Sequence, residues 1–298
     1  MTERFATDWL TLREPFDHAA RSIALAKRLA EQLPQRPRLL DLGAGTGSLF
    51  RFLAPIIGRG QDWILVDADA ALLDDAFGRT AAWARRLGFA ANAAGDTLSV
   101  STPHGLWRMQ AVHGDLTVMA SQRLRSRAGA IEAHGADALL CSALLDLASL
   151  TWLADLLRSL HVPFLACLTV DGRDSWQPAH PSDALIRSSF RRDQRRDKGF
   201  GPALGMAAAS ATLRALAARG FATVSAPSDW RVPRTALRMQ RALIEGAADT
   251  ARRANPAQHR AIALWQEARL RQAMRGRLAI RIGHRDILAL PQGIPLRG

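Results

Sequence analysis

The sequence contains no tyrosine and only two cysteines, Cys141 and Cys167. Two cysteines cannot form the disulfide framework that stabilises small secreted domains. Both lie in apolar runs, where a free thiol behaves as a small buried apolar side chain. The chain also lacks the spaced cysteine and histidine ligands of a zinc site. We therefore expect a cytoplasmic protein that binds no metal.

Long apolar runs are also missing. No stretch approaches the ~18–20 apolar residues that a membrane-spanning helix needs. The segment Met1–Phe5 lacks the charged, apolar and small-residue regions of a signal peptide. The sequence therefore predicts no membrane partner, in agreement with a cytoplasmic location.

Lysine is nearly absent: Lys27 and Lys198 are the only two, and 38 of the 40 basic residues are arginine. Such usage is typical of a GC-rich genome, so the net charge of +13 partly reflects coding bias. The arginines are scattered among acidic residues and form no long basic arm. This favours a solvated surface over a nucleic-acid interface, and nucleic acid stays the alternative partner. The 298 residues, 48% of them apolar, are enough for one large α/β domain.

The segment 39–49 is the most informative stretch of the chain. It places two leucines before Asp41 and then glycines at 43, 45 and 47. This pattern predicts a buried strand, a turn with almost no side-chain bulk and a helix start, where backbone N–H groups can bind a ligand. The spacing differs from a dinucleotide fingerprint, whose third glycine would fall on Ser48. Asp41 would repel a pyrophosphate and attract a cationic amino-acid group.

This segment resembles the D-x-G-x-G-x-G motif of class I S-adenosylmethionine-dependent methyltransferases. Asp67 ends an apolar run 20 residues after Gly47, and an acid there takes the ribose hydroxyls in nucleotide-binding α/β units. The pair Gly114–Asp115 resembles the family's adenine-side motif, and the run 138–147 is another buried strand that ends near an acid. A helix cap or a turn explains any one of these acids, but their order and spacing favour the methyltransferase.

The resemblance implies S-adenosyl-L-methionine as the cofactor and a Rossmann-like domain over residues 1–298. It also implies a set of cofactor-binding residues: Asp41, Gly43, Ala44, Gly45, Gly47, Asp67, Ala68, Gly114, Asp115, Leu116 and Ser142.

Apolar periodicity, proline and glycine predict alternating helices and strands. Strands are expected at 38–42, 62–67, 106–112 (in a hairpin with 97–101), 137–143, 162–169, 221–226 and 278–290, the last as one bent strand or a terminal hairpin. Helices are expected at 17–33, 48–57, 70–88, 117–133, from Ser149 or Thr151 to Leu160, and at 203–219. The fold class is α/β: a seven-stranded, doubly wound, mostly parallel sheet with one antiparallel strand near its edge and helical additions.

Three segments add to this framework. Residues 1–34 are expected to form an N-terminal helical strip over the cofactor. Residues 170–202 leave the carboxyl end of a strand, where such sheets hold ligands; they are expected to be a substrate lid with an anion-seeking face, or else a solvated basic loop. Residues 235–275 are expected to be a helical insertion between the sixth and seventh strands, which packs on the domain or forms a homodimer face.

Catalysis needs few groups, because methyl transfer from a sulfonium mainly requires alignment. A base is needed only if the nucleophile is protonated and weakly acidic. Asp146 follows the fourth strand and is the preferred catalytic residue, with a carboxylate at a helix start as the alternative. His113, His161 and His180 are the other candidate bases. The candidate substrate contacts are Arg13 in the N-terminal strip and Trp176, Arg192 and Arg196 in the expected lid.

The segment after the fourth strand also limits the substrate. It lacks the Asn-Pro-Pro-aromatic turn of amino methylation, and no proline precedes Cys141 as in cytosine methylation. The run Ser142–Asp146 resembles enzymes that act on small metabolites. We expect methyl transfer to oxygen or carbon of a small metabolite, which would be anionic if the lid arginines bind it. An RNA methyltransferase and a non-catalytic module that keeps the cofactor pocket are the alternatives.

Asp67→Ala is expected to weaken the binding of S-adenosylhomocysteine by at least ~1.5–3 kcal/mol, because hydrogen bonds to a charged acceptor are lost. Calorimetric titration measures this change. Gly45→Val is expected to weaken the binding of S-adenosylhomocysteine more than Asp67→Ala does, since a branched side chain fills the space that the cofactor needs. Unchanged affinity in the Asp67 variant would contradict the ribose assignment, and normal binding by Gly45→Val would remove the basis of the interpretation.

Overall fold

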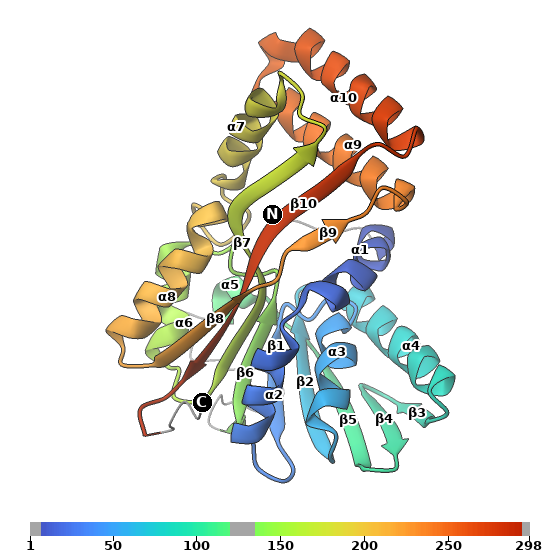
Figure 1. Cartoon of the computed structure of the whole chain (residues 1–298). Helices are drawn as coiled ribbons and strands as arrows, with labels where there is room; N and C mark the ends of the chain where they lie inside the picture. The colour runs from blue at the N-terminus through green and yellow to red at the C-terminus, as the bar shows by residue number, and fades with distance from the viewer. Residues whose placement is uncertain (1–6, 120–134, 294–298) are drawn as a thin grey trace.

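The computed structural model describes residues 7–119 and 135–293. Its central feature is one twisted sheet with helices on both faces and a group of three helices beyond one end (Figure 1). A helix long and apolar enough to cross a membrane does not occur among these residues.

The core of the sheet contains seven strands in the order β5-β2-β1-β6-β7-β10-β8. They are β1 (Arg38–Leu42), β2 (Gln61–Asp67), β5 (Gly105–His113), β6 (Ala138–Ser142), β7 (Phe164–Gln177), β8 (Ala222–Pro227) and β10 (Ala279–Leu290). Six of them run parallel, and β10 is antiparallel to both of its neighbours. The doubly wound, mostly parallel sheet with an antiparallel strand near its edge is confirmed, and the last strand is one bent strand rather than a hairpin.

Three strands were not counted in the expected seven, so the described residues form ten. The predicted hairpin places β4 (Thr97–Thr102) beside β5, and β3 (Ala90–Ala94) extends that edge. The third, β9 (Trp230–Val232), pairs with β10 outside the main path. The alanine-rich β3 is largely exposed, so it carries no alternating apolar pattern that would indicate a strand.

Alternate residues of the parallel strands face two separate cores, as the period of a strand requires. Leu39 and Leu65 pack with α2 (Ile23–Gln32), α3 (Ser48–Ile57) and α4 (Ala70–Arg86). Leu40 and Val66 pack with α6 (Leu150–Arg158) and α8 (Ala208–Ala218) on the opposite face. Short segments adjoin this second layer: α5 (Leu116–Met119) and the 3-10 turn η2 (Gly205–Ala207). Most of the expected helix 117–133 lies outside the described residues.

The expected helix 17–33 is wrong in its boundaries. The structure has two helices, α1 (Thr7–Ala20) and α2, which are separated at Arg21 and Ser22. The Ser22 hydroxyl accepts a hydrogen bond from the Leu25 backbone N–H and so caps α2. An apolar pattern that continues through a cap residue hides such a break.

The segment 170–202 is not one long loop. Strand β7 continues to Gln177, and α7 (Asp183–Gln194) follows it. The sequence of this strand extension is typical of a loop because it is rich in charged residues. In the structure these charges are paired: the Arg173 guanidinium donates hydrogen bonds to the carboxylates of Asp171 and Asp229. Arg281 of β10 also binds Asp229. Tertiary ion pairs therefore override the local signal.

Beyond the sheet, the long β7–β10 ribbon carries a helical cap. The two strands pair from Phe164–Ala289 to Gln177–Ala279. Helices α7, α9 (Leu237–Ala254) and α10 (His259–Met274, after the 3-10 turn η3, Pro256–Gln258) surround a third core that includes Trp176, Trp230 and Trp265. Figure 1 shows this cap at the end of the ribbon, above the carboxyl ends of the parallel strands. Helices α9 and α10 occupy most of the range 235–275, between β9 and β10.

A buried carboxylate joins the N-terminal helices to this ribbon. Asp286 of β10 is 1% exposed. One of its oxygens accepts the Ser22 N–H at 2.7 Å, and the other accepts the Leu168 N–H at 2.8 Å. Asp286 thus fixes the break between α1 and α2 against β7.

Asp286→Ala is expected to lower the free energy of unfolding by roughly 2–5 kcal/mol, because two buried N–H groups lose their partner. Urea denaturation measures the loss. The control is Asp62→Ala, which removes an exposed ion pair with Arg36 and is expected to cost less than ~1 kcal/mol. Equal stability of the two variants would show that Asp286 does not anchor the N-terminal helices.

Candidate functional site

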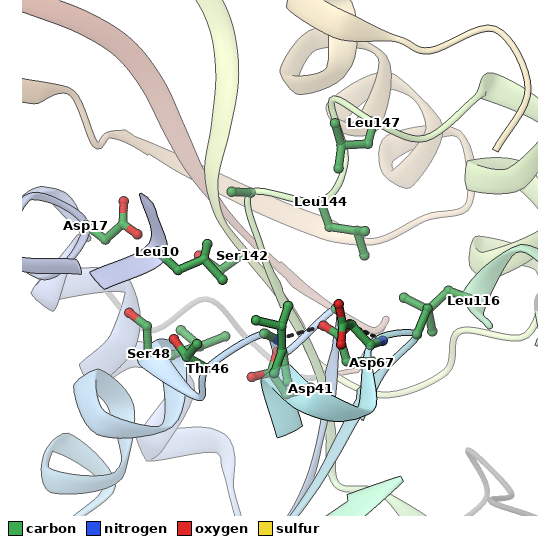
Figure 2. A pocket seen from close by; sticks show the side chains of 18 of the residues that line it. Leu10, Asp17, Asp41, Thr46, Ser48, Asp67, Leu116, Ser142, Leu144 and Leu147 are labelled. Carbon is green, nitrogen blue, oxygen red and sulfur yellow. Dashed lines mark hydrogen bonds between the residues drawn. The ribbon is translucent and has the colours of Figure 1, made fainter. Parts of the chain in front are cut away.

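A cavity of about 820 Å³ lies at the carboxyl ends of β1, β2, β5 and β6. This is the edge where open α/β sheets hold ligands. Figure 2 shows Asp41 and Asp67 on one side of the cavity and Leu144 and Leu147 on the other. Helix α1 closes it with Leu10, Arg13 and Asp17. Ten of the eleven predicted cofactor residues line it: Asp41, Gly43, Ala44, Gly45, Asp67, Ala68, Gly114, Asp115, Leu116 and Ser142.

The glycine-rich turn is fixed by its backbone. Gly43, Gly45 and Gly47 have φ angles of 67°, 53° and 75°, which L-residues with side chains rarely adopt. The N–H groups of Gly43 and Ala44 both donate to the Val66 carbonyl of β2. Gly47 is the predicted residue that is not among the described lining residues. A side chain on Gly47 would meet Ala76 and Met109. The absence of a side chain therefore lets the start of α3 pack closely against these two residues.

Asp41 is the most unusual group in the cavity. It is 1% exposed, and neither of its carboxylate oxygens has a hydrogen-bond partner among the described residues. Burial raises the pKa of Asp41 to about 8; Arg21 opposes this shift and Asp67 adds to it. A carboxyl group buried without partners costs free energy, and a ligand that supplies a hydrogen-bond donor would remove that cost.

Arg21 lies beside Asp41 in the lining and was not among the predicted residues. Its side chain is buried, and it donates to the hydroxyls of Ser48 and Ser142 at 3.0 and 2.9 Å. Its Nε has no partner within the described part of the chain. No sequence motif marks Arg21, because it comes 20 positions before Asp41 in a helical pattern. Together Arg21 and Asp41 suit the two charges of an amino-acid zwitterion.

Asp67 is held in place by the glycine turn. Its carboxylate accepts the Gly45 N–H at 2.8 Å and the Asp69 N–H at 3.0 Å, one on each oxygen. Burial raises the pKa of Asp67, and these backbone hydrogen bonds oppose the shift. Each oxygen keeps a lone pair, so Asp67 can still accept two hydrogen bonds from a pair of hydroxyls.

Asp115 and His113 stand at the rim of the cavity near β5. One oxygen of Asp115 accepts both the N–H and the hydroxyl of Thr117, so it also starts α5. The His113 Nε2 lies 3.0 Å from the Ala68 carbonyl. This contact ties β5 to the turn after β2 and favours a structural role for His113.

A second cavity, of about 420 Å³, lies between the sheet edge and the helical cap. It shares Arg13, Ala143 and Leu147 with the first cavity. Its lining includes five aromatic side chains, Trp9, Trp176, Trp230, Trp265 and Phe190, together with charged residues of both signs. The two cavities therefore meet at a common boundary after β6.

The backbone is strained at that boundary. Ala143 and Leu168 have positive φ angles of 53° and 55°, which cost on the order of 1–3 kcal/mol each in a residue other than glycine. Both line the second cavity. Such strain gathers at functional sites because the surrounding structure enforces it.

Of the other predicted site residues, some line a cavity and some do not. Asp146 and Trp176 line the second cavity, and Arg13 lines both cavities while it is bound to Asp17. The described lining residues do not include Arg192 or Arg196. Arg192 bonds to Asn255 and the Ala254 carbonyl, and Arg196 pairs with Asp193.

Two candidate bases have structural contacts instead. His180 Nδ1 accepts the Ser182 N–H, and His161 Nδ1 lies 2.8 Å from the Ser159 carbonyl ahead of β7. A further histidine, His284, does line the second cavity. It was missed because it follows a glycine in the last strand, where no motif marks it.

Six parallel strands, an antiparallel β10 inserted between β7 and β8, and a glycine turn after β1 below a cavity occur together here. The fold is that of the class I methyltransferases. This arrangement confirms the fold that the sequence motifs implied.

No protein-family model matches the sequence, and no match is found among curated proteins. Among solved structures, the chain is similar to a SAM-dependent methyltransferase from Geobacter sulfurreducens in complex with S-adenosyl-L-homocysteine (15% identity, 97% of this chain and 99% of that chain, TM-score 0.43). It is also similar to one from Thiobacillus denitrificans with the same ligand (14%, 97% and 100%, TM-score 0.42). A third is geranyl diphosphate C-methyltransferase from Streptomyces coelicolor A3(2) (15%, 90% and 79%, TM-score 0.40). At these identities and TM-scores the likeness carries no argument about what the chain does.

Asp41 is expected to make stability depend on pH. Its pKa is 3.8 ordinarily and about 8 in the folded chain, so the folded chain retains a proton that the unfolded chain releases. The stabilisation that this proton provides is complete below about pH 4 and is lost as the pH rises through about 8. Urea unfolding at several pH values should show the free energy of the wild type falling relative to Asp41→Asn. Parallel curves for the two proteins would contradict the buried, protonated state.

Proposed function

We propose that the protein is an S-adenosylmethionine-dependent methyltransferase that acts on oxygen or carbon of a small molecule. One observation carries this proposal: a cavity lined by the buried residues Arg21 and Asp41 and by Asp67 adjoins a second cavity of small-molecule size.

The residues of the first cavity fit the cofactor. Asp41 lacks a partner for its two oxygens among the described residues and would hold the ammonium group, while Arg21 would hold the carboxylate. Asp67 would accept the ribose hydroxyls, and Gly114, Asp115 and Leu116 would border the adenine. Gly45 lines the cavity without a side chain, which leaves room for a ligand against the backbone. The bound cofactor would supply a methyl group on a positively charged sulfur.

The protein itself would align the reactants and exclude water, which can be worth about 7–11 kcal/mol. Helix α1 closes both cavities, and ion pairs hold it: Glu14 binds the Arg51 guanidinium through two hydrogen bonds of 2.7 and 2.8 Å. Asp17 binds Arg13 and the Trp230 indole N–H. This fits the covering role expected for the N-terminal strip 1–34. Asp146 lines the second cavity and stays a candidate base.

A small acceptor fits better than RNA. The second cavity is within the ~300–1,000 Å³ typical of small-ligand sites and lies beneath the helical cap. Several of its basic residues are neutralised by carboxylates: Arg13 by Asp17, Arg173 by Asp171, and Arg187 by Asp174. The proposed anion-seeking lid finds no support in Arg192 and Arg196. A cytoplasmic location and a homodimer stay predictions from the sequence.

The test combines binding and turnover. S-adenosylhomocysteine is expected to bind more tightly as the pH rises toward about 8, because its ammonium group selects the ionised form of Asp41 and a proton is released. Calorimetry in two buffers of different ionisation enthalpy measures that proton, and Asp41→Asn is expected to bind weakly without releasing it. A metabolite extract incubated with the cofactor should gain one methyl group in one compound.

The alternatives give different results. Cofactor binding without turnover on any extract would indicate a non-catalytic module. Methyl transfer to RNA with an affinity that falls steeply with salt would indicate an RNA methyltransferase. Absence of S-adenosylhomocysteine binding would reject the proposal altogether.

A further inference from the structure

The second cavity is lined in part by aromatic side chains, and an unsatisfied polar atom lies among its lining residues. Four of the eight tryptophans of the chain line it: Trp9, Trp176, Trp230 and Trp265. Their rings contact one another in edge-to-face pairs, Trp9 with Trp230 at 6.0 Å and Trp176 with Trp265 at 5.3 Å between centroids. Aromatic side chains of this kind favour contact with a flat ring.

His284 supplies the polar atom. Its side chain belongs to a residue that is 4% exposed, and its Nδ1 has no hydrogen-bond partner among the described residues. The imidazole lies 5.0 Å from the Trp230 ring, and the Arg13 guanidinium lies 4.8 Å from the centroid of the same ring. Since Arg13 lines both cavities, His284 lies close to their boundary.

The backbone fixes this histidine in place. The register of β10 against β7 shifts between Ile282 and His284. A side chain on the intervening Gly283 would collide with Asp171 and Arg173. The His284 N–H donates a hydrogen bond to Asp229, which lies in the loop before β9. This hydrogen bond stabilises the β-bulge that the register shift creates.

The surroundings keep the imidazole neutral. Burial, and then the Arg13 guanidinium, lower the pKa of His284 to about 4, while Asp17, Asp171 and Asp229 act in the opposite direction. Arg173 and Arg281 lie against the same carboxylates. At neutral pH one ring nitrogen is therefore free of its proton and can accept a hydrogen bond.

We propose that the second cavity binds a planar aromatic molecule with a hydroxyl group, and that His284 binds this hydroxyl and takes its proton as it is methylated. This inference rests on the proposed function. The hydroxyl satisfies Nδ1, and the aromatic ring fills the space between the tryptophans.

The step balances in atoms and charge. The hydroxyl oxygen forms a bond to the methyl carbon, the carbon–sulfur bond breaks, and its electron pair goes to sulfur. The hydroxyl proton goes to His284, which leaves a methyl ether, a neutral thioether and an imidazolium. A weak base is sufficient, because an oxygen that already carries the new methyl group is a strong acid. The carboxylates of Asp17, Asp171 and Asp229 then stabilise the imidazolium.

Binding is tested first, without turnover. The probes are naphthol, its methyl ether and decahydronaphthol, titrated calorimetrically into the protein with bound S-adenosylhomocysteine. Naphthol is expected to bind about tenfold more tightly than either of the others, because only naphthol offers both a donor and a flat ring. His284→Phe is expected to bind naphthol and its ether equally. His284→Asn, whose amide keeps an acceptor, is expected to stay within about threefold of the wild type.

Turnover is tested with the same variants. Both His284→Phe and His284→Asn are expected to lose about 10²–10⁴-fold in kcat for naphthol methylation, while their affinity for S-adenosylhomocysteine stays unchanged and shows that they fold. His104→Phe, in the exposed turn between β4 and β5, is the matched control and should behave as the wild type.

The failures are distinguishable. If the wild type does not bind S-adenosylhomocysteine, the proposed function fails. If it binds, yet methylates only acceptors without an aromatic ring, the inferred substrate class is overturned and the function stands. If His284→Phe turns over normally while Asp146→Asn does not, Asp146 takes the proton and the role of His284 is overturned.

Discussion

The antiparallel pairing of β7 with β10 beyond the edge of the parallel sheet is the constraint on which the rest of the structure depends. Within the sheet, this pair closes the hydrophobic layers through Leu165 and Leu288. Beyond the sheet, the same ribbon continues to Gln177 and Ala279 and supports α7, α9 and α10. The ribbon thus adds a second cavity to the one at the edge of the parallel sheet. This second cavity exists only because the ribbon holds the cap opposite the carboxyl ends of the strands.

Buried charged residues hold helix α1, which forms the remaining wall of the two cavities. Helix α1 packs Trp9, Leu12 and Phe16 only partly buried against the third core, and of its described residues only Asp17 is fully buried. It is fixed by Glu14 to Arg51, by Asp17 to Trp230, and at its end by the Asp286 contact with Ser22. Removing one partner from a buried ion pair leaves an uncompensated charge, so these contacts define one position of α1. That position closes both cavities with one helix.

Burial has opposite effects on the protonation of the buried titratable group in each cavity. In the first, burial favours the protonated form of Asp41, which becomes a strong acceptor only when a cation arrives. In the second, burial favours the neutral form of His284, which leaves a nitrogen able to accept a proton. Both carboxylate oxygens of Asp41 and the Nδ1 atom of His284 lack a hydrogen-bond partner among the described residues. Each therefore has a free-energy cost that a fitting ligand would remove.

The sequence by itself determined the parallel core and the first cavity. The reason is that their signals are local: a strand, a glycine turn with positive φ angles and an acid at the next strand end lie within a few residues of one another, as at Asp41 and Asp67. Tertiary structure alone decided the second cavity. Arg13, Trp230 and His284 come from distant parts of the chain, and only the ribbon and α1 bring them together in the lining of this cavity. The charged extension of β7 shows the same limit, because Arg173 and Asp171 suit a strand only when Asp229 and Arg281 lie beside them.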